Sequence, residues 1–490
     1  MLKPRPYRAS GLVLPRNADL PGEFLYRVTP VLMAASGDLS YGIPQTAAIA
    51  LARETYPGEA NVAFTRGFIS SQAFVDRYLD DGPLQTLIPP DAKTGLSFSP
   101  THKDATDAYD WMGFEARREI LALLDEAISD PAAKVGVVGF DLNLPEVLDR
   151  LKSLRARARV IIDDSADHHG NGAAEDGAER QLIGAGVAVK RQHMGSLQHN
   201  KTIFVDGTSV QRVVCGSTNM SWRGFFVQSN NALTVTGKAA VDIFAAAFES
   251  YWNAPASFKA SPSAEWMSLG LNSLDAQISF SPHGAGNSVL KSIADDIRTA
   301  RSSIFYSLAF LAITPGAIRD VLFAQADRPD LFVSGISDKR AGVEVASGNS
   351  NRPPTYVAAL DKNAPRPFRD EPTGLAGGGG GTRMHHKFIV IDFDKPGARV
   401  YLGSYNMSKA ADGLNGENLV LIRDRRVATS YMIEAVRMID HYEFRVAHAA
   451  AARARTDLKL QPPPANPGEK PWRDEDYADP AKIKDRELFA

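Results

Sequence analysis

The stretch HNKTIFVD at His199–Asp206, followed by GSTNMS at Gly216–Ser221, decides the interpretation of this chain. A second version lies downstream, where HHKFIVID at His385–Asp392 is followed by GSYNMS at Gly403–Ser408. Both have the form H-x-K-x4-D followed by G-S-x-N-M-S, with nearly the same distance between the two parts. A single H-x-K triplet is uninformative, whereas two long copies with matched spacing indicate that a whole unit of the chain is duplicated.

A second landmark points to the same duplication. The tetrapeptide at Ser97–Pro100 recurs at Ser279–Pro282, with almost the same offset as the two histidine motifs. The repeat is far longer than that of a solenoid, so each copy is predicted to fold as a unit of its own. The predicted divisions are an N-terminal extension of unknown role at 1–95, a first domain at 96–255, a second domain at 275–455 and a C-terminal tail at 456–490.

Helical and strand patterns alternate in both copies. Apolar residues at helical spacing predict helices, and short apolar runs between them predict strands that are buried on both faces. The predicted helices cover 108–128, 145–154, 289–300 and 315–323, and the predicted strands cover 135–140, 159–163, 303–311 and 331–336. This alternation is typical of an α/β fold with parallel strand pairs. In the N-terminal extension, the Ala-, Leu- and Glu-containing stretch 46–54 also predicts a helix.

Composition limits the classes of function. The chain has 490 residues, of which 44% are hydrophobic and 23% are charged, and its formal net charge is -2. This length is enough for two hydrophobic cores. The near-zero charge excludes a broad basic surface for nucleic acid, but it leaves a local basic groove open. The one cysteine, Cys215, excludes an intramolecular disulfide and a zinc site built from cysteines.

Neither a targeting segment nor a membrane span is predicted. Met1–Asp19 contains basic residues and prolines but no continuous apolar run, so it does not resemble a secretory signal. No apolar stretch reaches the ~18–20 residues that a membrane-spanning helix needs. We therefore expect a cytoplasmic protein, and we expect a monomer because both motif copies lie in one chain.

The residue types in the two motifs suit a phosphodiester substrate. If each motif is a strand, side chains two positions apart point the same way, so each His shares a face with its Lys. Lys and Asn donors bind non-bridging phosphate oxygens, and an imidazole attacks phosphorus or transfers a proton near neutral pH. Two copies facing each other would place one His on either side of the phosphorus. Because two Lys already supply positive charge, we expect neither a metal ion nor another cofactor.

The paired motifs resemble the phospholipase D superfamily of phosphodiesterases, the HKD proteins, over roughly residues 97–450. This resemblance implies two tandem phospholipase D-like α/β/α sandwich domains with pseudo-two-fold symmetry and one active site at their interface. It also implies a covalent phosphohistidine intermediate that water or an alcohol resolves, with His199 as the nucleophile and His385 as the general acid. The resemblance further assigns phosphate binding to Lys201, Lys387, Asn219 and Asn406, with Ser217 and Ser404 in support.

One departure from the family pattern separates the two copies. Family members place a carboxylate a short distance after the Asn, where it orients a catalytic His. The second copy has Glu417 at this place, whereas the first copy has Asn230. A carboxylate raises the basicity of its His partner and stabilises the imidazolium, whereas an amide orients the ring without that charge. The difference predicts unequal roles for the two histidines and leaves open which His each group contacts.

Other residues near the motifs have structural interpretations. Asp206 and Asp392 lie an odd number of positions past the Lys, which turns them to the opposite strand face, so both are predicted to be structural. His386 is one step out of phase with His385 and is predicted to face away. The run Asp163–His169 follows a strand, and a solvated turn is favoured over a metal site there.

Two further segments keep two interpretations, and a third has one. Trp222 and Phe225–Phe226 predict either an apolar substrate wall or core packing. The glycine run Gly377–Gly381, in a long polar loop that leads to the second motif, predicts either a mobile wall of the active site or a surface insertion without a role. The proline-rich tail past Thr456 is expected to lie on the surface.

Three classes of function fit these observations. The leading one is an enzyme that hydrolyses or transfers the headgroup of a glycerophospholipid through a phosphodiester bond. An endonuclease acting on DNA or RNA is the alternative enzyme, and it would need a basic channel beside the histidines. A non-catalytic scaffold of the same fold is the third, although intact His, Lys and Asn in both copies count against it.

Overall fold

The structure is a computed structural model. It describes residues 22–34, 36–52, 54–67, 77–78, 81–170, 172–311, 314–337 and 384–453, and then 463–464, 466, 468–471, 474 and 477–489. The glycine run Gly377–Gly381 and the N-terminal stretch Met1–Asp19 lie outside these residues, so both predictions stay untested.

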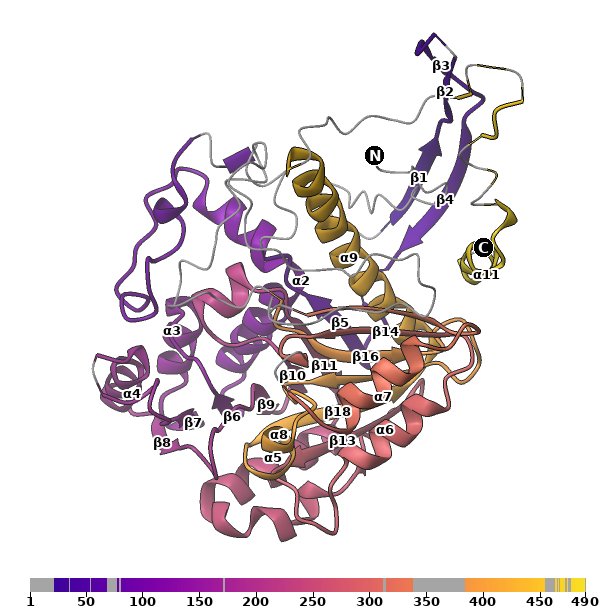
Figure 1. The fold of residues 1–490 in the computed structure, drawn as a ribbon. Coiled ribbons are helices and arrows are strands. Elements are labelled where there is room, and N and C mark those ends of the chain that lie inside the picture. The colour runs from indigo at the N-terminus through magenta and orange to yellow at the C-terminus, as the bar shows by residue number, and fades with distance from the viewer. Residues whose placement is uncertain are drawn as a thin grey trace.

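Two seven-stranded sheets form the body of the protein (Figure 1). The first contains, in spatial order, β5 (Ala60–Phe64), β11 (Asn231–Thr236), β10 (Gln211–Gly216), β9 (Thr202–Asp206), β6 (Lys134–Gly139), β7 (Ala158–Asp163) and β8 (Ala188–Gln192). The second contains β12 (Met267–Ser268), β13 (Asp275–Ser281), β18 (Glu417–Arg423), β17 (Arg399–Gly403), β16 (Lys387–Ile391), β14 (Ser303–Leu308) and β15 (Phe332–Ile336). The first six strands of the first sheet, β5 to β7, match the last six strands of the second sheet, β13 to β15, in the same order, which confirms a duplicated α/β architecture.

Both sheets are mixed rather than wholly parallel. The predicted strands β6 and β7 pair in parallel, and so do β14 and β15. The strands that carry the motifs run antiparallel to their neighbours, because β9 turns directly into β10 through a short turn closed by the Gly207 N–H and the Val210 carbonyl. Short turns join antiparallel strands, whereas the parallel pairs need the helical crossovers that the sequence pattern predicts.

Helices cover the sheets in layers (Figure 1). One apolar core joins the inner faces of both sheets to α5 (Lys238–Asn253) and α9 (Arg425–Arg453), which follow β11 and β18 at matched places in the two copies. A second core lies between the first sheet and α2 (Ala105–Ser129), α3 (Pro145–Leu154) and α4 (Ala174–Gly184). A third lies between the second sheet and α6 (Leu290–Arg298) and α7 (Ala317–Ala326). The shared inner core makes the two copies one packed body.

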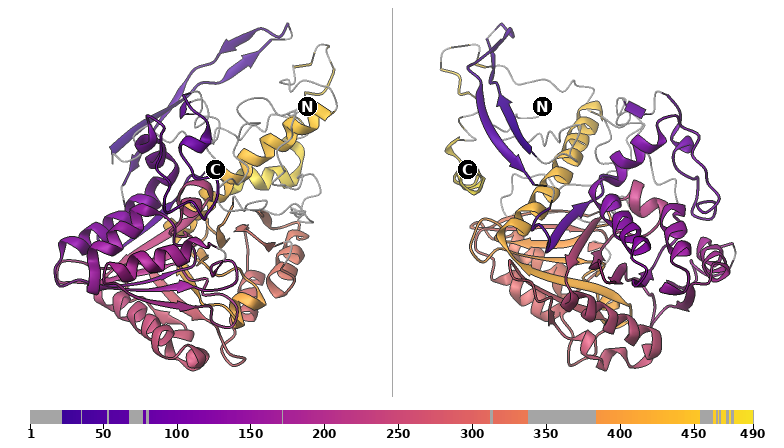
Figure 2. Two further views of the ribbon diagram at one scale, coloured as in Figure 1. Left: turned by 90° about the vertical axis from the view of Figure 1, so that its left-hand side faces the viewer. Right: turned by 180° about the vertical axis from the view of Figure 1, so that it is seen from behind.

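The predicted helix at 46–54 is wrong. Residues Gln45–Leu51 form β4, which pairs antiparallel with β1 (Gly22–Val28) along its whole length. A smaller pair, β2 (Val31–Met33) and β3 (Leu39–Tyr41), extends the same ribbon away from the body (Figure 2). The Ala-rich composition favours a helix locally, but a distant partner strand outweighs that weak preference.

The tetrapeptide landmark is also wrong, although the duplication is real. Phe280 in β13 lies opposite Asn418, and the residue opposite the matching Asn231 is Phe64 in β5. The first-copy counterpart of β13 is therefore β5, and Ser97–Pro100 belongs to no strand. Four identical letters are a weak signal, and only the strand register identifies the true match.

Candidate active site

The two motif histidines meet at the junction of the copies. The rings of His199 and His385 lie with their centroids 6.2 Å apart at an interplanar angle of 67°. The backbone N–H of His385 donates to the Ser229 carbonyl of the first copy at 3.0 Å, which anchors the start of the second motif against the first. Both rings are buried. The arrangement brings one imidazole from each copy to a single place.

The premise that each His and its Lys lie on a strand is wrong. β9 begins at Thr202 and β16 begins at Lys387, so each His precedes its strand. Instead, the Lys201 ammonium donates back to the His199 carbonyl, and the Lys387 ammonium donates to the His385 carbonyl at 2.6 Å. The His and Lys are held together by this local turn rather than by strand alternation.

Glu417 and Asn230 each contact the histidine of the opposite copy. The His199 Nδ1 lies 2.7 Å from the Glu417 Oε2, and the His385 Nδ1 lies 2.9 Å from the Asn230 Oδ1. Each histidine is therefore oriented by a residue of the other copy. Because the partner atom is an acceptor in both cases, the proton sits on Nδ1 and the Nε2 lone pair is left for the substrate. Within the described residues, neither Nε2 has a hydrogen-bond partner.

The two predicted serines hold these orienting groups. The Ser404 hydroxyl donates to the Glu417 Oε2 at 2.7 Å, and the Ser217 hydroxyl donates to the Asn230 Oδ1 at 2.9 Å. Each hydroxyl oxygen also accepts a backbone N–H, from Asn418 and Asn231 respectively, at 3.0 Å. The serines therefore act through the orienting groups and do not reach the reacting atoms.

The glycine before each serine is required by geometry. Gly216 has φ 137° and Gly403 has φ 140°, in the region that favours glycine. A Cβ at Gly216 would lie 2.5 Å from the Asn231 carbonyl oxygen, and one at Gly403 would lie 2.2 Å from the Asn418 carbonyl oxygen. Only glycine lets the chain pass this close to the neighbouring strand and deliver the Ser and Asn side chains.

The predicted phosphate-binding side chains gather at the same junction. Lys201 and Lys387 are almost fully buried, and the Lys201 Nζ lies 4.5 Å from the centroid of the Phe140 ring. Asn219 is buried and Asn406 is partly buried, and the side-chain oxygen of each has no hydrogen-bond partner in the described part of the chain. Two buried ammonium groups whose charges act on both histidines make this junction suited to an anion.

Burial sets the charge states of the site. Burial, followed by the charges of Lys201 and Lys387, holds the pKa of both histidines well below the ordinary value. Burial also lowers the pKa of Lys201 to about 8 and raises the pKa of Glu417 to about 8, the latter against the opposing charge of Lys201. The resting histidines are therefore neutral near pH 7, as a nucleophilic imidazole must be. An anion bound at this junction would offset the lysine charges and raise the histidine pKa values.

Backbone and amide contacts close the junction around the site. The Asn418 amide donates to the Asn200 Oδ1 at 2.7 Å, and its Oδ1 accepts the Gly216 N–H at 3.2 Å. Beside them, the Gly195 N–H donates to the Leu414 carbonyl at 2.9 Å. These bonds tie the loop before the first histidine to the loop that carries Glu417.

Some residues of the site were not predicted from the sequence. The Phe140 ring contacts the His199 ring at a centroid distance of 4.6 Å, and the charge of Arg223 acts on the pKa of His385. Phe140 directly follows β6, and Arg223 is the first residue of the short helix η4 (Arg223–Val227), two positions past the first motif. Apart from their positions next to elements that lead into the site, nothing in the sequence indicated that Phe140 and Arg223 lie there.

The two motif aspartates make different contacts. The Asp392 Oδ1 accepts the backbone N–H groups of Arg301 and Ser302, both at 2.8 Å. Asp206 is half-buried, and its carboxylate lies 3.6 Å from the Lys238 ammonium. Neither aspartate has a recorded contact with the histidines.

Several neighbouring residues belong to the core. His386 is fully buried, with its Nε2 3.1 Å from Glu434. Trp222, Phe225 and Phe226 are buried in the core of the first domain, and Phe226 stacks on Tyr109. The core interpretation of these aromatic residues therefore holds over the substrate-wall interpretation.

The solvated-turn prediction for Asp163–His169 is wrong at Asp163 and His168. Asp163 and His168 are buried, and the His168 Nδ1 lies 2.8 Å from the Asp163 Oδ2. Asp141, His168 and Glu175 also place side-chain ligand atoms within 4.8 Å of one another, close enough to hold a metal ion. Both nitrogens of His168 already face carboxylates, so ion pairing accounts for the cluster.

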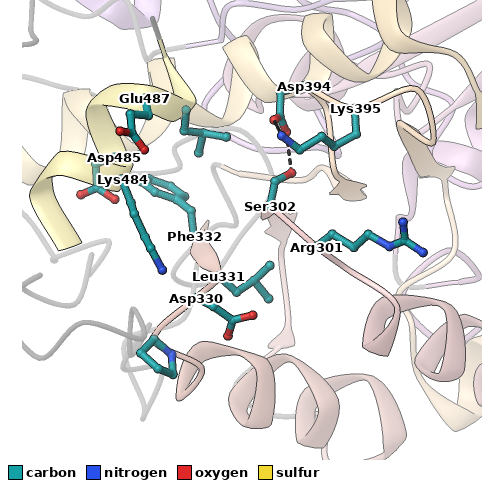
Figure 3. A pocket seen from close by; sticks show the side chains of 12 residues that line it. Arg301, Ser302, Asp330, Leu331, Phe332, Asp394, Lys395, Lys484, Asp485 and Glu487 are labelled. Carbon is teal, nitrogen blue, oxygen red and sulfur yellow. Dashed lines mark hydrogen bonds and ion pairs between the residues drawn. The ribbon is translucent and has the colours of Figure 1, made fainter. Parts of the chain in front are cut away.

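A separate cavity lies far from the histidines in the fold. It has a volume of about 220 Å³ and opens between α11 (Pro480–Leu488) and the second sheet (Figure 3). Arg301, Lys395 and Lys484 line it together with acidic side chains, so its charges largely balance. None of the motif residues lines this cavity. In the described residues, no helix is long and apolar enough to cross a membrane.

Comparison with known proteins gives a family and several distant likenesses. A family model described as "Cardiolipin synthase, PLD-like domain" matches residues 124–252 and 293–439, together more than half of the chain. A protein named phospholipase D from Rickettsia felis is 46% identical over 48 residues, which is 10% of this chain and 22% of that protein. A protein of the same name from Rickettsia bellii is 30% identical over 145 residues, which is 29% of this chain and 59% of that protein. The chain thus spans less than two thirds of the length of these relatives.

Solved structures with a similar chain path include proteins of different chemistry. Phosphatidylserine synthase from Haemophilus influenzae is 13% identical with a TM-score of 0.46, covering 67% of this chain and 85% of that one. The family member Nuc from Salmonella typhimurium is 23% identical with a TM-score of 0.24, covering 28% and 88%. The yeast tyrosyl-DNA phosphodiesterase is 12% identical with a TM-score of 0.33, covering 60% and 84%. These values do not distinguish between the reactions of the named proteins.

Proposed function

The chain belongs to the phospholipase D-like family, and from that membership we propose that it cleaves phosphodiester bonds through a phosphohistidine intermediate, with a glycerophospholipid headgroup as the leading substrate. The observation that carries the proposal is the pair of buried imidazoles, one from each copy, with ring centroids 6.2 Å apart. Both rings have their Nδ1 atoms engaged and their Nε2 atoms left for a substrate. A phosphorus atom between them would meet a nucleophile on one side and a proton donor on the other.

The reaction has two displacement steps. The His199 Nε2 attacks phosphorus, the bond from phosphorus to the leaving oxygen breaks, and His385 gives its proton to that oxygen. His385 then takes a proton from water or an alcohol, whose oxygen attacks phosphorus and breaks the bond to His199. Lys201 and Lys387 neutralise the phosphate oxygens in both steps, with Asn219 and Asn406 beside them. The net result is hydrolysis with water or transfer with an alcohol.

The carboxylate supports His199 as the nucleophile. When the imidazole bonds to phosphorus it becomes cationic. That charge lowers the raised pKa of Glu417, whose carboxylate, 2.7 Å away, then stabilises the cationic ring. His385 has the neutral Asn230 instead, which orients the ring but adds no negative charge. A group without a carboxylate partner releases its proton more readily, as a general acid must. The bound phosphate raises the pKa of His385, which allows that ring to hold a proton before it donates it.

The lipid headgroup is favoured over nucleic acid by charge. The chain has a formal net charge of -2, and within the described part of the chain the basic groups whose charges act on the histidines are Lys201, Lys387 and Arg223. That number of cations matches one phosphodiester better than a polyanionic strand, whose binding depends on many phosphate contacts.

The test uses three substrates in parallel. Bis(p-nitrophenyl) phosphate with and without EDTA measures the bond cleavage itself, and the expected result is turnover that EDTA does not change. Vesicles of mixed glycerophospholipids, assayed for released headgroup with and without 1-butanol, report lipid cleavage and transfer. Supercoiled plasmid and single-stranded oligonucleotide report nuclease action, with His199→Asn as the control for contamination. Nicking without headgroup release would replace the lipid proposal by the nuclease, and no turnover of any substrate would indicate a scaffold.

A further inference from the structure

A charged cluster lies directly behind the first half-site. The His168 ring has its Nδ1 2.8 Å from the Asp163 Oδ2 and its Nε2 3.0 Å from the Asp141 Oδ1. His168 is 8% exposed and Asp163 is completely buried. With a carboxylate at each nitrogen, both nitrogens act as donors and the ring is a cation. Burial opposes this charge, but hydrogen bonds from the ring to Asp141 and Asp163 raise the pKa of His168 to about 10.

Two contacts lead from this cluster to the catalytic ring. The other oxygen of Asp163 accepts the backbone N–H of Gln198 at 2.6 Å, and Gln198 immediately precedes His199. The Phe140 ring lies between the two histidines, with centroid distances of 4.3 Å to His168 and 4.6 Å to His199. One route therefore fixes the backbone next to His199, and the other contacts its ring.

The second half-site has no carboxylate at the position that corresponds to Asp141. Val138 pairs with Thr202 and Ser307 pairs with Phe388, so the position that matches Asp141 in the second copy is Phe310. An apolar ring there cannot hold an imidazolium. The two-carboxylate arrangement, as far as the described residues extend, belongs to the half-site whose histidine is paired with Glu417.

We propose that His168 is a positioning residue for His199: its cation holds Asp163 and Phe140 in place, and these fix the line along which the His199 Nε2 attacks phosphorus. The proposal rests on the proposed function and deepens it, because it concerns the nucleophile alone. Without the cation, the buried Asp163 carboxylate loses its compensating charge and shifts, and the Gln198 backbone shifts with it. Displacement of a reacting group by a fraction of an ångström slows an in-line attack while substrate binding changes little.

The test compares His168→Gln with His102→Gln. His102 is also buried, with its Nε2 2.8 Å from the Tyr78 carbonyl and its Nδ1 accepting the Asp104 N–H at 3.0 Å, and it lies outside the site. With bis(p-nitrophenyl) phosphate, kcat/KM of His168→Gln, which reports the attack on phosphorus, should fall about 10- to 100-fold. His102→Gln should lose a comparable amount of Tm while keeping the wild-type kcat/KM.

Loss of folded protein is separated from loss of positioning by counting competent sites. The amplitude of the p-nitrophenol burst gives the concentration of sites that form the intermediate, and the burst rate constant per site reports the attack. A reduced rate constant at normal amplitude supports the proposal. A normal rate constant at reduced amplitude, or equal kcat/KM in the two variants, would overturn it. Failure of the proposed function is recognised separately, because the wild-type protein itself would then give no turnover.

Discussion

The two half-sites are nearly identical except where their histidines are oriented. Each half-site has a lysine folded back on its histidine carbonyl, a glycine with positive φ and a serine that supports the orienting group. The orienting groups themselves differ, because Glu417 contacts His199 and Asn230 contacts His385. Duplication thus gives two matched half-sites, and one changed side chain places a carboxylate against His199 and an amide against His385.

The comparison also shows why neither half-site is complete alone. Each orienting group comes from the opposite copy, and the same exchange holds for the Asn418 contacts to the first copy. The predictions below test how the two half-sites differ, in order of decreasing expected effect.

The largest effect is expected at the histidines. His199→Asn and His385→Asn should each lower steady-state turnover of bis(p-nitrophenyl) phosphate by about 10³-fold or more, because each removes a group that forms or breaks bonds. Rapid mixing should separate them. p-Nitrophenolate leaves without a proton, so His385→Asn should still give a stoichiometric burst, whereas His199→Asn should give none. A burst only from His199→Asn would reverse the assignment of nucleophile and acid.

The next effect concerns the orienting groups. Glu417→Gln removes the charge that stabilises the phosphohistidine and should lower kcat about 10- to 100-fold. The amide can be accommodated because the Asn415 Oδ1 has no hydrogen-bond partner and can accept from it after a flip of that side chain. Asn230→Asp is the matched change in the other half-site, and it should alter kcat less. Equal losses of kcat in the two variants would show that the charge of Glu417 contributes nothing beyond what an amide provides.

A smaller effect is expected in the pH dependence. Burial lowers the pKa of Lys201 to about 8, so the free enzyme loses this charge as the pH rises through that value. We therefore expect kcat/KM to fall above about pH 8, while kcat at saturation falls at higher pH because bound phosphate raises the lysine pKa. Lys201→Arg keeps its charge throughout this range and should lose the alkaline fall. An unchanged profile in that variant would assign the fall to another group.

The smallest effect separates the motif aspartates. Asp392→Asn weakens the charged acceptor that binds the backbone N–H groups of Arg301 and Ser302, and it should reduce the free energy of unfolding by about 1–3 kcal/mol. Asp206→Asn removes only a half-exposed ion pair with Lys238 and should stay within about 0.5 kcal/mol of the wild type. Urea titrations measure both, and kcat of the folded variants should be unchanged. A larger loss at Asp206 would contradict the contrast.

The sequence by itself determined the duplicated α/β architecture. The helix α3 falls at its predicted residues, and the strands β7 and β15 differ from prediction only at their first residue. Such elements are encoded by local periodicity, and the two motifs are encoded by residue identity, so neither requires knowledge of distant contacts. The same local information also predicted that the residues at the Glu417 and Asn230 positions would make the copies unequal.

Only the tertiary structure decided which groups meet. His199 and Glu417 lie 218 positions apart in the chain, and no local pattern states that the second copy orients the histidine of the first. The same holds for β4, which forms a strand because it pairs with β1. It also holds for His168, whose charge depends on Asp141, a residue 27 positions earlier in the chain. Propensity and spacing act over a few residues, whereas partner choice and burial arise when whole faces pack together. The charges of buried groups follow from that packing.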